Sequence, residues 1–111
     1  MTQLVATYSY RTKPGVSEDA YLAAAETPHA RLAAAPGFQY RCLARTEEGW
    51  LETIFWESAK AADAANETFM AAMAGSEWLG MIDTESLEVH RYPVMQAGGP
   101  APAAASVAAG A

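Results

Sequence analysis

The sequence predicts an α+β fold in which four strands form one antiparallel sheet and two helices cover one of its faces. Four runs rich in β-branched and aromatic residues have the length of strands. Two alanine-rich stretches, each preceded by a serine, have the signature of helices. Prolines, glycines and charged residues separate these segments, whose order is strand, helix, strand, strand, helix, strand.

The first strand is expected at Leu4 to Arg11, a run of β-branched and aromatic residues that a Lys-Pro-Gly sequence ends. Ser17 is a typical N-cap, and the two acidic residues that follow it favour a helix N-terminus. The first helix is therefore predicted from about Glu18 to Ala34, before a Pro-Gly breaker.

The larger apolar residues of this helix, Leu22, Ala25 and Leu32, lie on one stripe at helical spacing. His29 falls on the same stripe and is expected to face the interior. Pro28 lacks a backbone donor and should bend the helix immediately before this histidine. Two roles stay open for His29: a neutral imidazole bonded at the edge of the core, or a proton acceptor that lines a pocket.

Residues 38–45 alternate along the chain and predict a half-exposed edge strand, with Tyr40 on one face and Arg41 and Arg45 on the other. A short polar loop at residues 46–49 joins this strand to the next one in an antiparallel hairpin. Charges on an edge strand commonly prevent unwanted pairing, which is one interpretation of the two arginines.

The strand from Trp50 to Trp56 is expected at the centre of the sheet, because both of its faces are mainly apolar. Glu52 is the exception, since it shares a face with the two tryptophans. An ionisable group is costly to bury in such surroundings, and groups of this kind tend to be functional. Glu52 is therefore the first candidate for a catalytic residue.

Ser58 is predicted to cap a second helix that ends at Gly75. Asn66 lies beside the inward stripe of this helix, either as a solvated residue or as a ligand contact. Trp78 follows in a short extra turn of helix, where it either packs under the loop or lines the mouth of a pocket. The expected inward stripe itself consists of Ala62, Ala65, Phe69 and Met73.

The last strand is predicted from Thr84 to Tyr92, before Pro93. His90 lies on its more polar face and is expected to be exposed or to lie in an interface. Residues 1–95 are thus expected to form one domain. Residues 96–111, rich in alanine, glycine and proline, are expected to form a disordered tail.

The element order is the split βαβ arrangement of ferredoxin-like folds, βαββαβ, with both helices on one face of the sheet. The other face also carries apolar side chains, among them one of the neighbours Phe55 and Trp56. A single copy of the chain has no element left to cover that face. We therefore expect a homodimer in which a second copy covers it.

The composition limits the classes of function. A formal net charge of −6 argues against nucleic acid or an anionic membrane as a partner. No secretory signal is apparent, so the cytoplasm is the expected location. One cysteine, Cys42, and two histidines give no metal-ligand spacing, and no phosphate-binding glycine motif occurs. The sequence predicts neither a metal nor a cofactor.

Two short sequences, PGF at residues 36–38 and WES at residues 56–58, carry a resemblance to a known family. From Val5 to about Pro93 the chain resembles the dimeric α/β-barrel proteins of the antibiotic biosynthesis monooxygenase type. Oxygenases of this type work without metal or flavin. They bind a phenolic, anthrone-like substrate, assist its deprotonation and let the resulting anion react with dioxygen.

In those oxygenases a tryptophan in the WES sequence and an asparagine four residues before it line the pocket. Trp56 matches the tryptophan, whereas Glu52 stands at the position of the asparagine. A carboxylate repels an anion unless it carries a proton, so this difference leaves open whether Glu52 acts as a base or as a neutral donor. The haem-degrading members resemble the chain in fold only, because their haem contacts have no counterparts here.

The resemblance implies a cofactor-independent monooxygenase-like protein that acts on a small aromatic molecule, phenolic, anthrone-like or quinol-like. Such a molecule is expected to enter between helices and sheet, where Trp56, Tyr40 and Trp78 form apolar walls. Glu52 or His29 would then take the acidic proton.

Two alternatives remain open: a cofactor-free cyclase or isomerase, and a non-catalytic dimer that binds a small molecule or another protein. The non-catalytic protein should have Glu52 in an ion pair with an arginine such as Arg41, Arg45 or Arg91, and its pocket should be filled with side chains. The cyclase or isomerase needs the same base and pocket but consumes no oxygen.

Overall fold

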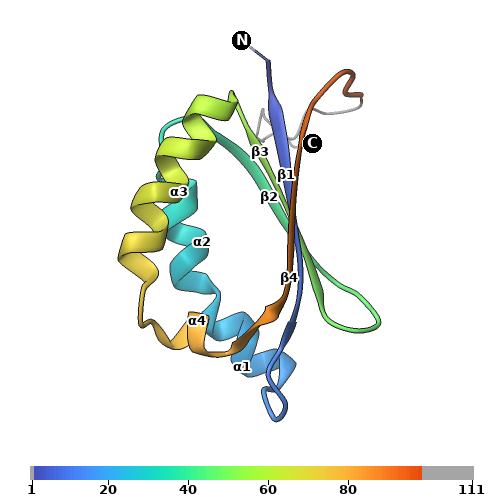
Figure 1. Ribbon diagram of the computed structural model, residues 1–111, viewed down its shortest axis with the longest axis vertical. Helices are drawn as coiled ribbons and strands as arrows, with labels where there is room; N and C mark the ends of the chain where they lie inside the picture. Colours follow the sequence, from blue (N-terminus) through green and yellow to red (C-terminus); the bar gives the residue numbers. More distant parts are fainter. Residues whose placement is uncertain (1, 99–111) are drawn as a thin grey trace.

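The computed structural model describes residues 2–98, which form a four-stranded sheet with all the helices on one face (Figure 1). The strands are β1 (Leu4–Thr12), β2 (Phe38–Arg45), β3 (Trp50–Trp56) and β4 (Ile82–Pro93). The helices are α1 (Glu18–Ala24), α2 (Glu26–Ala33), α3 (Ala59–Met73) and α4 (Glu77–Gly80). The predicted ferredoxin-like α+β fold is confirmed. Most of the tail expected from residue 96 lies outside the described residues.

The strand order is β2-β3-β1-β4 and every neighbouring pair is antiparallel, so β2 is an edge strand as predicted. In β3 the tryptophans and Glu52 are buried beneath the helices, whereas Leu51 and Phe55 point to the open face. Tyr8 of β1 is the residue directly opposite Glu52. None of the helices within residues 2–98 is long and apolar enough to cross a membrane.

The predicted single helix at residues 18–34 is two helices, α1 and α2, which meet at Ala25. Pro28 explains the position of the break, because a proline ring collides with the carbonyl group four residues earlier, here that of Ala24. The expected bend immediately before His29 is therefore wrong by several residues.

The side chains that face the sheet from α1 and α2 differ from the predicted stripe. The buried residues are Tyr21, Ala25, Pro28 and Leu32. Leu22 and His29 lie one position beyond this stripe and both are exposed, so the expectation that His29 faces the interior is wrong.

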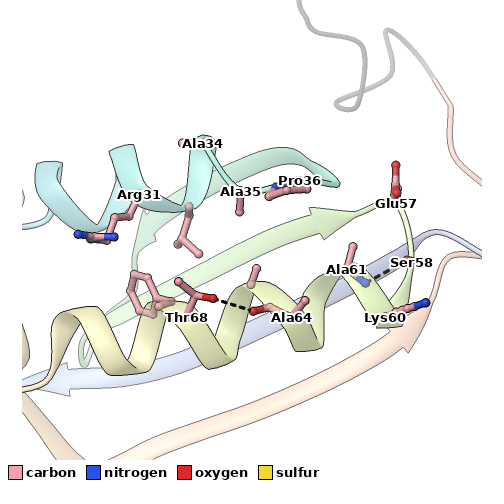
Figure 2. A pocket seen from close by; sticks show the side chains of 13 residues that line it. Arg31, Ala34, Ala35, Pro36, Glu57, Ser58, Lys60, Ala61, Ala64 and Thr68 are labelled. Atoms are coloured by element: carbon pink, nitrogen blue, oxygen red, sulfur yellow. Dashed lines mark hydrogen bonds between the residues drawn. The ribbon is translucent and has the colours of Figure 1, made fainter.

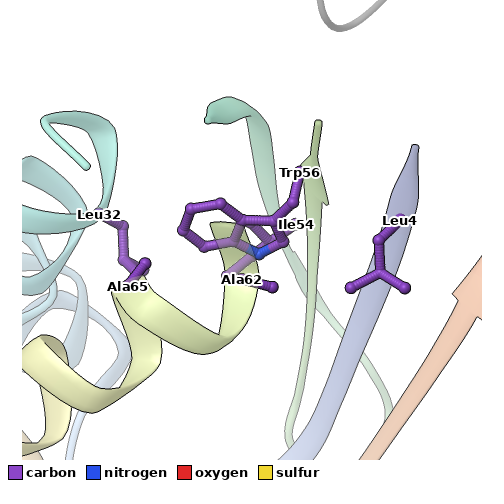
Figure 3. Close-up of a cluster of buried hydrophobic side chains, with 6 residues drawn as sticks. All are labelled: Leu4, Leu32, Ile54, Trp56, Ala62 and Ala65. Atoms are coloured by element: carbon purple, nitrogen blue, oxygen red, sulfur yellow. The ribbon is translucent and has the colours of Figure 1, made fainter. Parts of the chain in front are cut away.

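The core between helices and sheet consists of two clusters. The first contains Leu4, Leu32, Ile54, Trp56, Ala62 and Ala65, and Figure 3 shows the Trp56 indole reaching from β3 toward the helices. The second contains Tyr10, Tyr21, Ala25, Trp50 and Ile82. Tyr8 packs against both clusters and therefore lies where they meet.

The PGF and WES sequences lie side by side, since the Glu57 amide donates a hydrogen bond to the Gly37 carbonyl (2.9 Å). Gly37 has φ +85°, which other residues rarely adopt, and a Cβ there would lie 2.5 Å from the Ala61 Cβ. The turn is thus pressed against the first turn of α3. Both sequences hold the end of β3 against that helix.

Replacing Gly37 with alanine is expected to lower the free energy of unfolding by about 3 kcal/mol, because left-handed strain and a steric clash add together. Gly75→Ala is the matched control, since Gly75 has φ +75° but open space around its Cβ position. Urea denaturation of both variants separates the two terms. Equal losses would show that the contact with Ala61 contributes nothing.

Candidate functional site

A cavity of about 110 Å³ lies between the sheet and the helices, beside the junction of the two core clusters. Its walls are mainly apolar, and most of them are aromatic, aliphatic or methionine side chains. The sheet contributes Tyr8, Tyr10, Arg41, Glu52, Ile54, Trp56, Ile82, Thr84 and Leu87 to the lining. The helices contribute Pro28, Leu32, Ala62, Asn66, Phe69, Met70, Met73, Trp78 and Leu79.

Glu52 is the only carboxylate in this lining, and it is 8% exposed. Arg41, on the neighbouring strand β2, donates from Nε to Glu52 Oε2 in an ion pair whose two side chains are each 11% exposed. Arg41 NH1 also lies 3.3 Å from His29 Nδ1. A short chain of polar groups thus leads from the cavity to the surface of α2.

The second oxygen of Glu52 is available to a ligand. Oε1 makes no hydrogen bond to any residue in the described range 2–98. In the same range no fully buried side-chain oxygen or nitrogen lacks a partner, so Oε1 keeps some accessible surface. Because the rest of the side chain is enclosed, we assign that surface to the cavity.

Three aromatic residues form a hydrogen-bonded chain along one wall. The Trp78 indole donates from Nε1 to the Tyr21 hydroxyl (3.1 Å), which is also hydrogen-bonded to the Tyr10 hydroxyl. Tyr21 is 1% exposed and Tyr10 5% exposed. The chain fixes α4 and α1 to the sheet, so the position of Trp78 in the cavity wall is set by this contact.

Burial raises the pKa of both Tyr10 and Tyr21, and the hydrogen bond to Tyr21 raises that of Tyr10 further. A tyrosine whose pKa is higher in the folded than in the unfolded protein does not change the stability below the unfolded pKa, which is about 10. Above that pH the unfolded protein ionises more readily than the folded one, so the folded protein loses stability. We expect the free energy of unfolding to fall as the pH rises above about 10.

Tyr10→Phe tests this assignment. At pH 7 the variant should lose about 1 kcal/mol, because one buried hydrogen bond is removed. Above pH 10 its stability should decline less steeply than that of the wild type, since one of the groups that resist ionisation is gone. Urea denaturation at both pH values measures the two effects, and identical alkaline slopes would contradict the assignment.

Four of the residues singled out in the sequence meet at this cavity. Glu52 and Trp56 come from β3, Asn66 from α3 and Trp78 from α4. Asn66 is exposed and Trp78 half-buried, so both lie nearer the solvent than the first two. Of the two positions considered for Trp78, the structure has it in the cavity wall.

Tyr40 does not line the cavity, in contrast to its expected place beside Trp56. A β-bulge between Phe38 and Tyr40 pairs Phe38 with Trp56 but Tyr40 with Phe55. The bulge turns Tyr40 to the open face, where it packs against the Phe55 ring (centroids 6.3 Å apart). Alternation alone cannot reveal such a shift.

His29 also lies outside the cavity and reaches Glu52 only through Arg41. Sequence reasoning treated Arg41 as an edge-strand charge or as one of three partners for Glu52, and it missed the tyrosines Tyr8 and Tyr10. The available signal was the antiparallel pairing of β1 with β3, which sets Tyr8 opposite Glu52.

A larger hollow of about 650 Å³ lies between α2 and α3 near the PGF turn (Figure 2). Alanine side chains form much of its lining, and its charged residues, Arg31, Glu57 and Lys60, are all exposed. A hollow of this kind offers no buried ionisable group. The cavity that contains the buried Glu52 is therefore the candidate functional site.

Comparison with known proteins supports the fold assignment. No protein-family model matches the sequence, and no curated protein matches it either. A putative antibiotic biosynthesis monooxygenase from Chloroflexus aurantiacus has a similar structure, with a TM-score of 0.67 at 19% identity over 88% of this chain and 98% of that one.

Two further solved structures have described activities. SnoaB from Streptomyces nogalater, a cofactor-independent oxygenase, aligns with a TM-score of 0.69 at 14% identity over 87% of this chain and 97% of that one. The haem degrader MhuD from Mycobacterium tuberculosis aligns at 0.67 and 24% identity over 86% and 99% of the two chains. In structure, the chain is thus similar to proteins of the antibiotic biosynthesis monooxygenase type, as its PGF and WES sequences implied.

Proposed function

We propose that this protein is a cofactor-independent monooxygenase-like enzyme that acts on a small phenolic, anthrone-like or quinol-like molecule. The observation that carries the proposal is a single carboxylate, Glu52, whose free oxygen is assigned to a mainly apolar cavity that has several aromatic side chains in its lining. A base in such surroundings can take the proton of a phenol while water is excluded. The similarity to a cofactor-independent oxygenase supports the same reaction class.

The first step would move a proton from the substrate hydroxyl to Glu52 Oε1. The negative charge would then pass from the Glu52 carboxylate to the substrate oxygen beside it. Arg41, which is paired with Glu52, would be close to the charge before and after this step. One negative charge faces Arg41 both before and after the proton transfer. No additional charge has to be buried, so the free-energy cost of ionising a phenol in an apolar cavity is lower. The electron-rich anion of an anthrone then reacts with dioxygen at its ring CH2 carbon. That carbon loses both of its hydrogens and becomes a carbonyl with one oxygen atom, and the second oxygen atom leaves as water with the two hydrogens.

The size of the cavity sets a condition on the ligand. A volume of about 110 Å³ is smaller than the roughly 150 Å³ that holds a benzene molecule in an engineered protein. Even one ring therefore needs some movement of the walls, and a tricyclic ligand needs more. Met70 and Leu87, which are 50% and 42% exposed, line the cavity and mark the place where it can widen toward solvent.

The side chains do not fit haem as they stand. Neither His29 nor His90 lines the cavity, and a volume of about 110 Å³ is far too small for a porphyrin. No histidine of the described residues is therefore placed in this cavity to hold the haem that MhuD binds.

The second candidate is a small-molecule-binding protein without catalysis. The ion pair between Glu52 and Arg41 is the feature that the sequence analysis expected of such a protein. That alternative also required a pocket filled with side chains, whereas the structure has an open cavity beside Glu52. Turnover therefore separates the two candidates.

We further propose that a second copy covers the open face of the sheet. Tyr40, Leu51 and Tyr92 are 42%, 37% and 51% exposed there, beside the half-buried Val5 and Phe55. Contiguous apolar surface of this kind marks an interaction site. Light scattering should give twice the chain mass, whereas a monomer at micromolar concentration would contradict the proposal.

The cytoplasmic location stays a prediction.

Oxygen consumption and product formation with a panel of anthrones and quinols test the proposed reaction. Glu52→Gln should slow oxygen consumption by about 100-fold or more, since it removes the base but keeps the shape. Glu57→Gln, which alters an exposed glutamate outside the cavity, is the control.

The outcomes of this assay are distinct. Full activity in Glu52→Gln would remove the proposed base. Product without oxygen consumption would assign a cyclase or isomerase, and binding without product would assign the non-catalytic role.

A further inference from the structure

A second polar group opens into the cavity beside Glu52. Tyr8 lies on β1 directly opposite Glu52, and both side chains point to the helix-covered face. Residues paired in this way across antiparallel strands have Cβ atoms about 5 Å apart. Tyr8 therefore stands next to the proposed base, and it is not part of the mechanism described above.

The hydroxyl group of Tyr8 is available, unlike that of its neighbour Tyr10. Tyr10 is hydrogen-bonded to Tyr21, so its hydroxyl is committed to the wall. The Tyr8 hydroxyl makes no hydrogen bond within residues 2–98, where no fully buried polar side-chain atom lacks a partner. Its oxygen consequently keeps accessible surface, and Tyr8 lines the cavity.

We propose that Tyr8 is a ligand-contacting residue, whose hydroxyl donates a hydrogen bond to a carbonyl oxygen of the molecule that Glu52 deprotonates. This inference rests on the proposed function and narrows its substrate class. The ligand is a hydroxyaryl ketone or a related compound that presents a donor to Glu52 Oε1 and an acceptor to Tyr8 across one aromatic ring.

The positions of the cavity groups favour Tyr8 over three other donors in the lining, Trp56, Asn66 and Thr84. Asn66 and Thr84 are both exposed and therefore lie nearer the solvent than Glu52 does. The indole Nε1 of Trp56 also has no hydrogen-bond partner among residues 2–98. Trp56 is four residues beyond Glu52 on the same strand, however, which separates their Cα atoms by about 13 Å. A molecule of one ring that touches Glu52 meets Tyr8 first.

The surroundings also keep Tyr8 a donor. Burial raises the pKa of its hydroxyl, the Glu52 carboxylate raises it further, and the Arg91 guanidinium lowers it. Arg91 is itself engaged by Asp63 of α3 in an ion pair. The protonated hydroxyl is therefore the form present at neutral pH, and only this form can donate to a carbonyl.

Two single-ring probes of matched size test the proposal: 3-hydroxyacetophenone, which carries a donor and an acceptor, and 3-ethylphenol, which carries the donor alone. Dissociation constants of both are measured by calorimetry for the wild type, Tyr8→Phe and Tyr10→Phe. The wild type should bind the ketone about three- to tenfold more tightly than the ethyl compound, the range for one hydrogen bond. Tyr8→Phe should abolish this preference while its affinity for 3-ethylphenol is unchanged.

Tyr10→Phe should keep the preference, because its hydroxyl faces Tyr21. A preference that survives in Tyr8→Phe, or a wild type that binds both probes equally, would overturn the inference and leave the proposed function standing. If neither probe binds the wild type, both the proposed function and the inference fail. Denaturation curves check that Tyr8→Phe folds, which is expected because its hydroxyl has no partner to lose within the described chain.

Discussion

Replacing Trp56 with alanine is expected to lower the free energy of unfolding by about 4 kcal/mol. Trp56 is 3% exposed on a central strand, and its ring packs edge-on against Phe38 (centroids 5.8 Å apart). Its removal leaves a void that the neighbouring alanines of α3, Ala62 and Ala65, cannot fill. Urea or thermal denaturation followed by circular dichroism measures the loss.

Trp56→Phe provides the graded control, because it keeps an aromatic ring while losing part of the volume. Its loss should be about 2 kcal/mol, between the wild type and the alanine variant. If Trp56→Ala costs less than about 1 kcal/mol, the indole is not part of the core and the packing described here is incorrect.

Replacing Arg41 with methionine is expected to cost about 3 kcal/mol, because it leaves the Glu52 carboxylate buried without its partner. Methionine keeps the apolar stem of the arginine, so the loss reports mainly the charge. The double variant Arg41→Met with Glu52→Leu should recover most of that stability, since apolar side chains can replace a buried pair at little cost.

Arg11→Met is the matched control for a surface pair. Arg11 and Asp83 lie 3.5 Å apart with side chains 55% and 36% exposed, so their ion pair should contribute less than about 1 kcal/mol. The same denaturation experiment compares all four proteins. If Arg41→Met and Arg11→Met lower the free energy of unfolding by the same small amount, the Glu52 carboxylate is hydrated. That result would contradict a candidate site built on a buried Glu52.

Local sequence signals predicted much of the fold. Ser17 and Ser58 cap helices as expected, each accepting a hydrogen bond of 3.1 Å from the amide three residues on. The central position of β3 followed from its two apolar faces. These features depend on neighbours in the chain, which a single sequence displays directly.

The departures have causes that act between segments. The bulge after Phe38 depends on how β2 meets β3, and it moves Tyr40 to the other face. The end of α1 at Ala24 follows from Pro28, whose effect was predicted in kind but not in position. His29 was misplaced for a separate reason. The buried residues keep helical spacing through the break, but their stripe includes Tyr21 and Pro28 rather than Leu22 and His29.

The candidate site was predicted only in part, because local patterns place residues of one strand but not the contacts between strands. Glu52 and Trp56 lie on one strand, where alternation puts them on one face. The choice of Arg41 as the partner of Glu52, among three arginines considered, depends on the register of β2 against β3. Tyr8 lies in the site because the register of β1 against β3 places it opposite Glu52. No local sequence pattern shows this register.

The three tryptophans offer the most direct test of the central claim, that an aromatic ligand binds between the helices and the sheet. Trp56 and Trp78 line the cavity, whereas Trp50 belongs to the second core cluster and does not. In an NMR titration with 3-ethylphenol, the indole signals of Trp56 and Trp78 should shift and saturate together, while that of Trp50 stays nearly fixed. Unchanged signals for all three, or a shift confined to Trp50, would contradict the account.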